Sequence, residues 1–428
     1  MIVVDRICRL AGACFRTGPR AFSSVLLLLL VGVGVWQAVQ YSRGYFAYHR
    51  AVESLERYDF ATARQQSRLA GYLEPGNPLV WLLAAQAARR EGDLGEARSH
   101  LRLYRSLVGS IPEARLEAAL QETQSGNLEA YVYDLMAKVD AGHPAAEQIL
   151  EALAVGSVQI YHFDRGVFWI NQLLSRYPVN PVGRLIRAQM DDVLRKRDRA
   201  TAGCRELLAD FPDNRNAKVL LAGLLYREQQ FDESAQLYGE MHQKYPDDLR
   251  PLLGLTRCRE QMGQAEEARS LVQELEEKFS DNSSALLEAA RFALADNRQE
   301  DAERLLRRAV ELSPGDHEIH YQMGLCLERA GKTEEARYHL ERFKQVEADV
   351  ARLDILLKEV VNSSKDPIPR REAGMICLRN GQTSEGLRWL LGALELAPND
   401  KLTHAALADY YTSQGDLNLS AIHRQRAR

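Results

Sequence analysis

The sequence lacks the spaced residue patterns that most enzymes and metal proteins carry. It has 6 cysteines among 428 residues, and no two of them stand in the C-x-x-C spacing of a zinc ribbon or a redox site. No H-E-x-x-H, G-x-S-x-G or P-loop motif occurs either, nor a G-x-G-x-x-G between a strand and a helix. We therefore expect a protein that is not an enzyme, needs no metal or other cofactor and takes no small-molecule substrate.

Proline is scarce in this sequence, and basic residues form no cluster in the body of the chain. Proline contributes only 14 residues while hydrophobic residues reach 46%, a composition typical of a helical protein. The net charge is −4, and four arginines within the first twenty residues make the rest of the chain more acidic still. The body has no Lys/Arg-rich stretch with interleaved aromatic residues, so we expect no binding of nucleic acid. The closest histidines, His317 and His320, have no third ligand near them in the sequence.

One long stretch, in contrast, has no charge at all. It covers residues 21–42 and follows a basic tail, residues 1–20. As a helix it would span about 33 Å, enough for a hydrocarbon core of about 30 Å. Trp36 and Tyr41 stand near one end, where amphipathic rings favour the membrane interface. The stretch predicts a transmembrane signal anchor that contacts the lipid bilayer.

The arginines before this stretch outnumber those just after it, which places the N-terminus in the cytoplasm. In a bacterium with two membranes, this predicts a single-pass protein of the inner membrane with a periplasmic body. Two alternatives stay open. The stretch could be a cleaved signal peptide, although Trp36 would then fill a position that needs a small residue. The Arg-rich residues 6–24 also resemble a mitochondrial targeting sequence, which would place the protein in a mitochondrial membrane.

Small residues recur along the chain at a nearly constant interval. In residues 302–314, Ala302 is followed by Leu306, Ala309 and Pro314 at steps of four, seven and twelve residues. The small position of this frame falls at 63, 97, 131, 166, 200, 234, 268, 302, 336, 386 and 420, although position 131 holds a tyrosine. Nine of the ten intervals are 34 or 35 residues and one is 50. Five residues before most of these positions a glycine, or once Asn297, predicts the turn between two helices.

Two antiparallel helices in 34 residues, with a small residue at their close approach, resemble the tetratricopeptide repeat (TPR) family. Residues 321–346, YQMGLCLERAGKTEEARYHLERFKQV, carry the resemblance most clearly. It implies an all-α fold, a right-handed superhelical TPR solenoid, here preceded by the predicted transmembrane helix. Such repeats bury their apolar faces only by stacking on their neighbours.

The interval of 50 residues divides the predicted array. We expect about nine repeats in residues 44–350, an extended helix and loop in residues 351–366, and two C-terminal repeats in residues 367–428. Apolar residues at 350, 353, 356, 357 and 360 would lie on one face of the extension, which could pack on its own solenoid or dock a partner.

The resemblance also implies a concave groove lined by the first helix of each repeat. The residues that it places there include Leu82, Gln86, Arg89, Gln189, Arg227, Arg257, Arg291 and Tyr321. We expect an apolar groove with arginines that are either solvated or bind an acidic peptide. The lysine and asparagine set with which chaperone-docking TPR domains hold a terminal carboxylate is absent at these positions.

These observations predict a non-catalytic, membrane-tethered scaffold or adaptor that binds a protein or peptide partner in the groove. Two other functions stay open at this point: a permanent structural subunit of a larger membrane complex, and an organellar import or assembly receptor.

Overall fold

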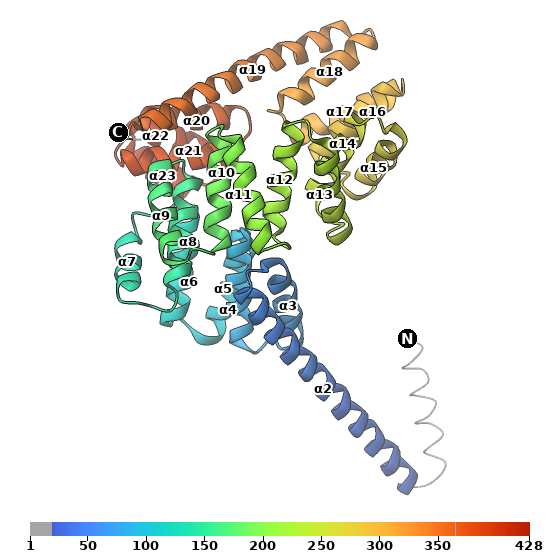
Figure 1. Ribbon diagram of the computed structural model, residues 1–428, viewed down its shortest axis with the longest axis vertical. Helices are drawn as coiled ribbons and strands as arrows, with labels where there is room; N and C mark the ends of the chain where they lie inside the picture. Colours follow the sequence, from blue (N-terminus) through green and yellow to red (C-terminus); the bar gives the residue numbers. More distant parts are fainter. Residues whose placement is uncertain (1–18, 364) are drawn as a thin grey trace. The chain divides into compact units, whose positions relative to one another are not determined.

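The computed structural model describes residues 19–363 and 365–428, with the side chains of residue 30 onward. Helices account for most of these residues, and none of the residues described is in a strand. The helices are α2 (Pro19–Glu56), α3 (Phe60–Leu73), α4 (Pro78–Glu91), α5 (Leu94–Val108), α6 (Pro112–Gln124), α7 (Val132–Asp140), α8 (Ala146–Gln159), α9 (Phe163–Arg176), α10 (Pro181–Val193), α11 (Arg197–Asp210), α12 (Arg215–Arg227), α13 (Phe231–Lys244), α14 (Leu249–Gln261), α15 (Ala265–Lys278), α16 (Ser283–Ala295), α17 (Gln299–Leu312), α18 (His317–Arg329), α19 (Thr333–Asn362), α20 (Pro367–Arg379), α21 (Thr383–Leu396), α22 (Lys401–Ser413) and α23 (Leu417–Arg426). They follow one another as antiparallel pairs (Figure 1), so the predicted all-helical repeat fold is confirmed.

The first helix of most pairs begins at a residue that can cap it. The side chain of Asn180 accepts a hydrogen bond from the backbone N–H of Gly183, and Asp400 caps α22 in the same way. Such a cap satisfies one of the N–H groups that the first helical turn leaves unpaired. Proline takes the first position of α4, α10 and α20, where its missing N–H costs nothing.

The small residues of the sequence ladder lie where two helices touch. Ala97, Ala200, Ser234 and Ala302 have no exposed surface, which explains why a larger residue is excluded there. Tyr131 is the exception. It stands directly before α7, which has only 9 residues where the second helices on either side, α5 and α9, have 15 and 14.

The turn inside each pair contains one residue in the left-handed region. Gly92, Gly263 and Asn297 occupy this position, as the sequence predicted, with φ of 102°, 73° and 59°. Non-glycine residues fill it in other pairs: Tyr58, Tyr161, Arg195 and Gln229. The residues on both sides of the turn thus fix its geometry even where no glycine is present.

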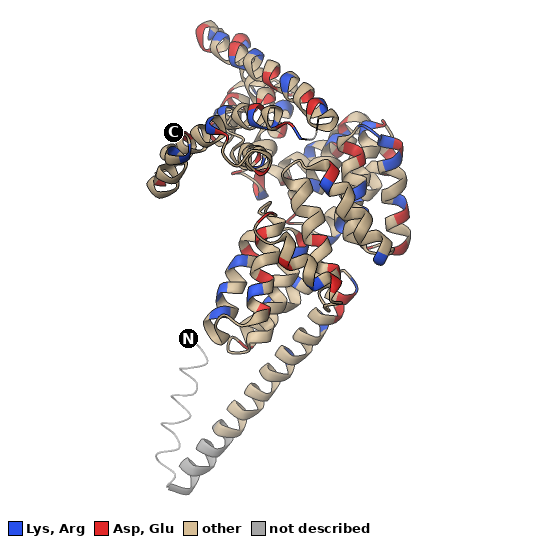
Figure 2. Cartoon of the chain, turned by 90° about the vertical axis from the view of Figure 1, so that its left-hand side faces the viewer, with Lys and Arg blue, Asp and Glu red and all other residues tan. Residues whose placement is uncertain are grey.

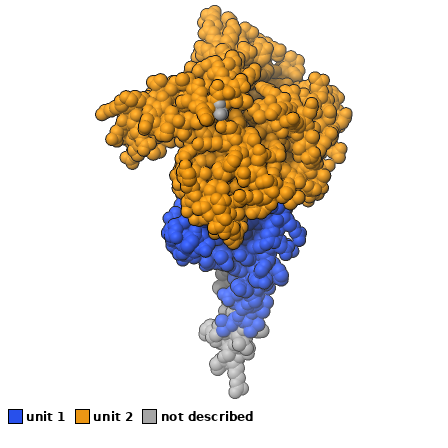
Figure 3. All heavy atoms as spheres, turned by 60° about the vertical axis from the view of Figure 1, so that its left-hand side comes forward, with its two compact units in different colours: residues 1–121 blue, residues 122–428 orange. Residues whose placement is uncertain are grey.

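The chain divides into two compact units, residues 1–121 and residues 122–428 (Figure 3). The division falls within α6, inside the region predicted as an array of about nine repeats. In the first unit, α3 and α4 pack on the second half of α2 around Ala51, Ala63 and Ala87.

The first part of α2 carries the residues of the predicted membrane anchor. None of its residues between residue 30 and Ser42 is charged (Figure 2). Apolar side chains in this part, such as those of Val35 and Trp36, are exposed. By length and hydropathy, however, none of the helices in the described part of the chain qualifies as a membrane span. The predicted basic tail lies outside the described residues up to residue 18, as do Cys8 and Cys14, and the side chains of residues 21–29 are also outside them.

The interval of 50 residues coincides with the longest helix of the second unit. α19 has 30 residues and buries Val346, Leu356 and Val360, whereas Val350 is 37% exposed. Beyond the length of an ordinary second helix, α19 is held by α20: Arg352 donates two hydrogen bonds to the carboxylate of Glu372. The extension therefore packs on its own chain, which was one of the two possibilities predicted.

The turn between α8 and α9 contacts α20 and α21, which follow it by more than 200 residues. The buried guanidinium of Arg370 donates a hydrogen bond to the carbonyl oxygen of Tyr161 (3.0 Å), 209 residues away. The ring of Tyr161 stacks on Trp389, with ring centroids 3.4 Å apart, and Nε2 of His162 donates to the carbonyl oxygen of Gly392 (2.9 Å). We call this group of interactions the closure contact. The sequence did not predict it, because a solenoid needs contacts only between neighbouring repeats.

Candidate protein-binding face

In the first unit, three predicted groove residues lie on α4. Leu82 is half-buried and packs against Ala85, Leu101 and Tyr104, so its side chain belongs to the core between two pairs. Gln86, one turn further along α4, is half-buried as well.

The prediction that Arg89 lines an accessible groove is corrected by its burial. The side chain has no exposed surface, and its Nε lies 2.8 Å from the carboxylate of Glu117, which is only 2% exposed. An arginine and a carboxylate that are both removed from water stabilise the fold only as a pair. Arg89 therefore holds α4 to α6.

In the second unit, the predicted arginines connect successive first helices. Arg227 at the end of α12 lies 2.7 Å from the carboxylate of Asp192 on α10. Arg291 on α16 lies 3.3 Å from Glu260 on α14. The partner acid comes from the preceding first helix in both pairs, and each arginine side chain is still one-third or more exposed.

A third arginine shares its partner with Arg291. Glu288 on α16 has no exposed surface, and its carboxylate lies 3.1 Å from Arg257 on α14 and 3.1 Å from Arg291. The two guanidinium groups together compensate one buried carboxylate. We call these paired residues of α10, α12, α14 and α16 the inner ion row.

The sequence leaves open whether these arginines are solvated or bind an acidic peptide, and in the structure their side chains stay about one-third or more exposed. Each one already has a carboxylate of this chain as its partner. The acids follow or precede their arginines by about one repeat, at 35, 31 and 31 residues. A search for opposite charges at this spacing would have found them in the sequence.

The remaining two predicted residues are on the same series of helices. Gln189 on α10 is exposed, and Tyr321 on α18 is half-buried with its ring centroid 5.0 Å from that of Phe343. In the second unit, then, the structure brings Arg257 and Arg291 together through Glu288. It places Gln189 and Tyr321 on other first helices of the series.

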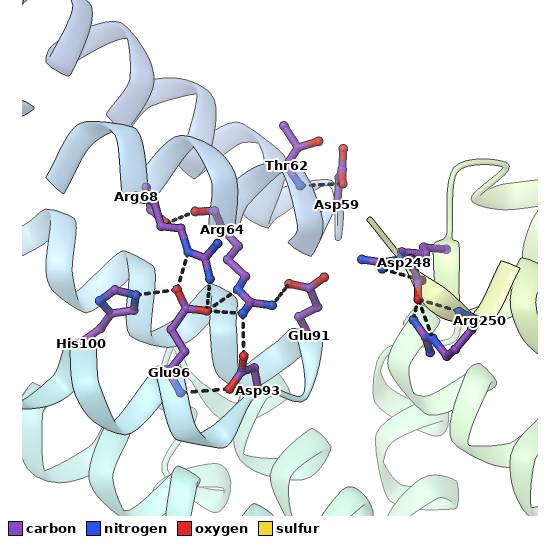
Figure 4. Close-up of polar contacts among 12 residues, drawn as sticks. Asp59, Thr62, Arg64, Arg68, Glu91, Asp93, Glu96, His100, Asp248 and Arg250 are labelled. Atoms are coloured by element: carbon purple, nitrogen blue, oxygen red, sulfur yellow. Dashed lines mark hydrogen bonds and ion pairs between the residues drawn. The ribbon is translucent and has the colours of Figure 1, made fainter. Parts of the chain in front are cut away.

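Sequence reasoning also missed a charge cluster in the first unit (Figure 4). The guanidinium of Arg64 on α3 contacts three carboxylates, those of Glu91, Asp93 and Glu96. Burial alone would raise the pKa of Glu96, but hydrogen bonds from Arg68, His100 and Arg64 lower it to about 2. The cluster joins the first two helix pairs, and none of its members was a groove candidate.

Beside the closure contact lies Glu395, whose carboxylate is 3.4 Å from Nδ1 of His162. Burial raises the pKa of Glu395 to about 7, although Arg165 lies 3.2 Å away. Burial lowers the pKa of Arg370 to about 10 and that of His162 to about 4. A buried, partly compensated group of charges of this kind is sensitive to any change that separates its members.

Two histidine pairs occupy equivalent places in two repeats. Nε2 of His320 donates to the carbonyl oxygen of Pro314 (3.0 Å), so Nδ1 of His320 is the acceptor for Nδ1–H of His339 (2.9 Å). His404 and His423 repeat this arrangement at 2.9 Å. No group of three metal-binding side chains occurs among the residues described.

We predict that four histidines with lowered pKa values, His162, His320, His339 and His423, make the second unit lose stability in mild acid. Burial, followed by the charge of His320, lowers the pKa of His339 to about 4, and burial also lowers the pKa values of His320, His423 and His162. A histidine with a lowered pKa stabilises the fold fully above its unfolded pKa of 6.5, and this contribution is lost as the pH falls toward about 4. Glu395 acts oppositely, because its raised pKa adds stability below 4.5 that is lost as the pH rises through about 7.

As the pH falls, the stability lost through the four histidines exceeds the stability gained through the one carboxyl group of Glu395. We therefore expect the free energy of unfolding to fall by up to about 1.4 kcal/mol per pH unit for each of these histidines. Urea unfolding between about pH 7.5 and about pH 5 measures the slope. His339→Asn keeps a donor for His320 but cannot titrate, so it should reduce the slope, and an unchanged slope would contradict the assignment.

Comparisons with known proteins identify the repeat. Two family models, each described as tetratricopeptide repeat, match this sequence, one at residues 225–291 and the other at residues 193–248 and 300–349. No curated protein matches it. A solved tetratricopeptide repeat protein from Parabacteroides merdae is 17% identical and covers 67% of this chain and 99% of its own, with a TM-score of 0.36.

Two further solved structures are similar at the same low level. Human IFIT1, solved as a dimer with m7Gppp-AAAA, is 16% identical over 82% of this chain and 89% of its own, with a TM-score of 0.44. YrrB, described as a TPR protein with an unusual peptide-binding site, is 16% identical over 47% of this chain and 96% of its own, with a TM-score of 0.29. From the family-model matches and the helix pairs that carry them, we conclude that this chain contains tetratricopeptide repeats.

Proposed function

We propose that this protein is a non-catalytic scaffold that binds another protein through the first-helix face of its second unit. The inner ion row carries the proposal. Arg227 and Arg257 keep 42% and 41% of their side chains exposed, and Arg291 keeps 33%, although each is paired. Partly exposed charges held in fixed positions bind a partner without the entropic cost of ordering free side chains.

The paired state of the arginines also defines the partner. Since each arginine already faces a carboxylate, the row offers alternating charges and not a positive surface. A partner with both basic and acidic side chains matches such a row, whereas a uniformly acidic peptide would be repelled by Asp192 and Glu260. Gln189 and Tyr321 add uncharged contacts on α10 and α18.

We further propose that residues 21–42 tether the protein to the bacterial inner membrane, with the repeats in the periplasm. The support is the uncharged sequence of this stretch and the exposed apolar side chains of α2, among them Leu30, Val35 and Trp36. Apolar side chains on an isolated helix face are stable in lipid but costly in water.

One experiment tests both parts of the proposal. Membranes from cells that express the full chain are washed with alkaline carbonate, solubilised in detergent and used for affinity capture. We expect the chain to stay in the membrane pellet and to capture a partner. The variant Arg227→Gln/Arg257→Gln/Arg291→Gln should lose that partner, because it removes the charges of the row. Since it also leaves the buried Glu288 without a guanidinium, a loss of capture is attributed to the binding face only if circular dichroism and urea unfolding show that the variant is folded.

The matched control removes the same number of charges from second helices. Arg304→Gln/Arg308→Gln/Arg337→Gln changes exposed arginines of α17 and α19 and should capture the partner as the wild type does. Equal capture by both variants would rule out the inner ion row as the binding face. Release by carbonate would rule out the tether and leave the binding result standing.

A further inference from the structure

The short helix α7 leaves a pocket on the outer side of the second unit. A second helix of ordinary length would begin several residues earlier, but here the chain from Leu128 to Tyr131 forms a turn and α7 starts only at Val132. The missing helical turn exposes part of α9, which lies beside α7 (Figure 1). The result is a pocket of about 380 Å3 between α7 and α9, which we call the α7–α9 pocket.

Aromatic rings form the walls and mouth of the α7–α9 pocket. Tyr133 on α7 is 84% exposed and Phe168 on α9 is 52% exposed. Trp169 also lines the pocket, with its ring centroid 4.7 Å from that of Phe168 at an interplanar angle of 74°. Large exposed aromatic side chains around a concave site are typical of a site for a partner side chain.

The rim of the pocket is acidic. Arg165 is the only basic lining residue, and it is held by Glu129 (2.7 Å) and by the buried Glu395 (3.2 Å). The carboxylate of Asp164 is exposed at the same rim. Glu129 and Asp164 are both exposed at the rim, and Arg165 shares its charge between Glu129 and Glu395, so the rim attracts a positive charge.

We propose that the α7–α9 pocket binds a lysine or arginine side chain in an extended segment of a partner protein. The aliphatic stem of such a side chain lies against the rings of Tyr133, Phe168 and Trp169, and its charged end reaches Asp164 and Glu129. Aromatic faces and a carboxylate attract a cation together, which gives selectivity for a basic over an apolar side chain of the same length. This site is separate from the inner ion row and goes beyond the function proposed for that row.

Peptides that differ at one position provide the test. Three nine-residue peptides are compared, each with a leucine on both sides of a central lysine, norleucine or glutamate. Their binding to the full chain is measured by thermophoresis. We expect the lysine peptide to bind about tenfold more tightly than the norleucine peptide, a difference of about 1.4 kcal/mol, and the glutamate peptide not to bind.

Variants of the protein place the peptide in the pocket. Asp164→Asn and Phe168→Ala should each weaken binding of the lysine peptide about fivefold or more. Asp134→Asn is the matched control, since Asp134 lies on α7 but pairs with Lys138 (2.9 Å) outside the pocket, and it should bind like the wild type. The triple variant of the inner ion row keeps the α7–α9 pocket and should also bind normally, so failure of the two proposals can be distinguished.

Several outcomes would overturn the proposal. They are equal binding of the lysine and norleucine peptides, unchanged binding by Asp164→Asn, or equal loss in Asp134→Asn. Concentration-dependent dimerisation of the wild type that Tyr133→Ser abolishes would assign the pocket to a second copy of this chain instead. Unfolding curves of all variants must match the wild type for a loss to be attributed to the pocket.

Discussion

Adding one methyl group at Gly392 should open the closure contact. A Cβ at this position would lie 2.3 Å from the carbonyl oxygen of Ile160 and 3.5 Å from Cδ of Arg370. The first distance is far below van der Waals contact, so α21 and the turn between α8 and α9 must separate. We expect Gly392→Ala to reduce the free energy of unfolding of the second unit by about 1–3 kcal/mol.

The direction of the stability change distinguishes Gly392 from a glycine that has free space around it. Gly392 lies inside helix α21, where alanine is intrinsically favoured over glycine by about 1 kcal/mol. Gly239, inside α13, has open space around it, because a Cβ at this position would have no atom within 4 Å. Gly239→Ala should therefore stabilise the protein, while Gly392→Ala should destabilise it.

Two measurements check the pair of glycine variants. Urea unfolding gives the stability, and small-angle X-ray scattering gives the radius of gyration, which should increase for Gly392→Ala only. If both variants shift stability in the same direction and neither expands, α21 does not hold the turn between α8 and α9 in solution.

The second large effect concerns the buried pair of the first unit. Arg89→Leu leaves Glu117 as a buried carboxylate that has lost its guanidinium and keeps a hydrogen bond from Gln121 Nε2 (3.1 Å). Removing one partner of a buried ion pair typically costs about 3–5 kcal/mol. Glu117→Leu should also destabilise the first unit, because it removes the carboxylate that lies 2.8 Å from the buried guanidinium of Arg89.

Removing both charges should cost much less. Arg89→Leu/Glu117→Leu replaces the pair with apolar side chains, which is often close to neutral. The exposed pair of Lys138 and Asp134 provides the comparison, because Asp134→Ala should cost at most about 1 kcal/mol. Hydrogen exchange of the α4 amides measures the stability of the first unit in the Arg89 and Glu117 variants, and exchange of the α7 amides measures the effect of Asp134→Ala in the second unit. Additive effects of the two leucine substitutions would show that Arg89 and Glu117 do not act as a pair.

Much of the fold could be predicted because it is repeated locally. The small residue at the helix contact, the glycine or asparagine in the turn and the capping residue each recur at the same interval, and each acts within its own pair. A weak signal in one repeat is then compensated by the same signal in the others. Tyr131 shows the limit, since the repeat frame continues through it but the helix after it is shortened.

Whether a predicted binding residue is accessible depends on its neighbours, as the burial of Arg89 shows. The sequence places Arg89, Arg257 and Arg291 on first helices, but it does not show that Glu117 and Glu288 are buried beside them. The burial of a carboxylate depends on how two pairs stack. An arginine predicted to line a groove can thus be part of the core.

The helix pairs, their turns and their repeat family follow from the sequence alone, because hydrophobic period, capping and turn residues act over a few residues. The tertiary structure decides which charges are paired and which distant segments of the chain are in contact. The closure contact joins Tyr161 to Arg370 and Trp389 through a backbone carbonyl and a ring face. A backbone carbonyl is present in every residue, so the sequence does not mark this one as a contact. Whether two segments 209 residues apart meet depends on the curvature added by every helix pair between them.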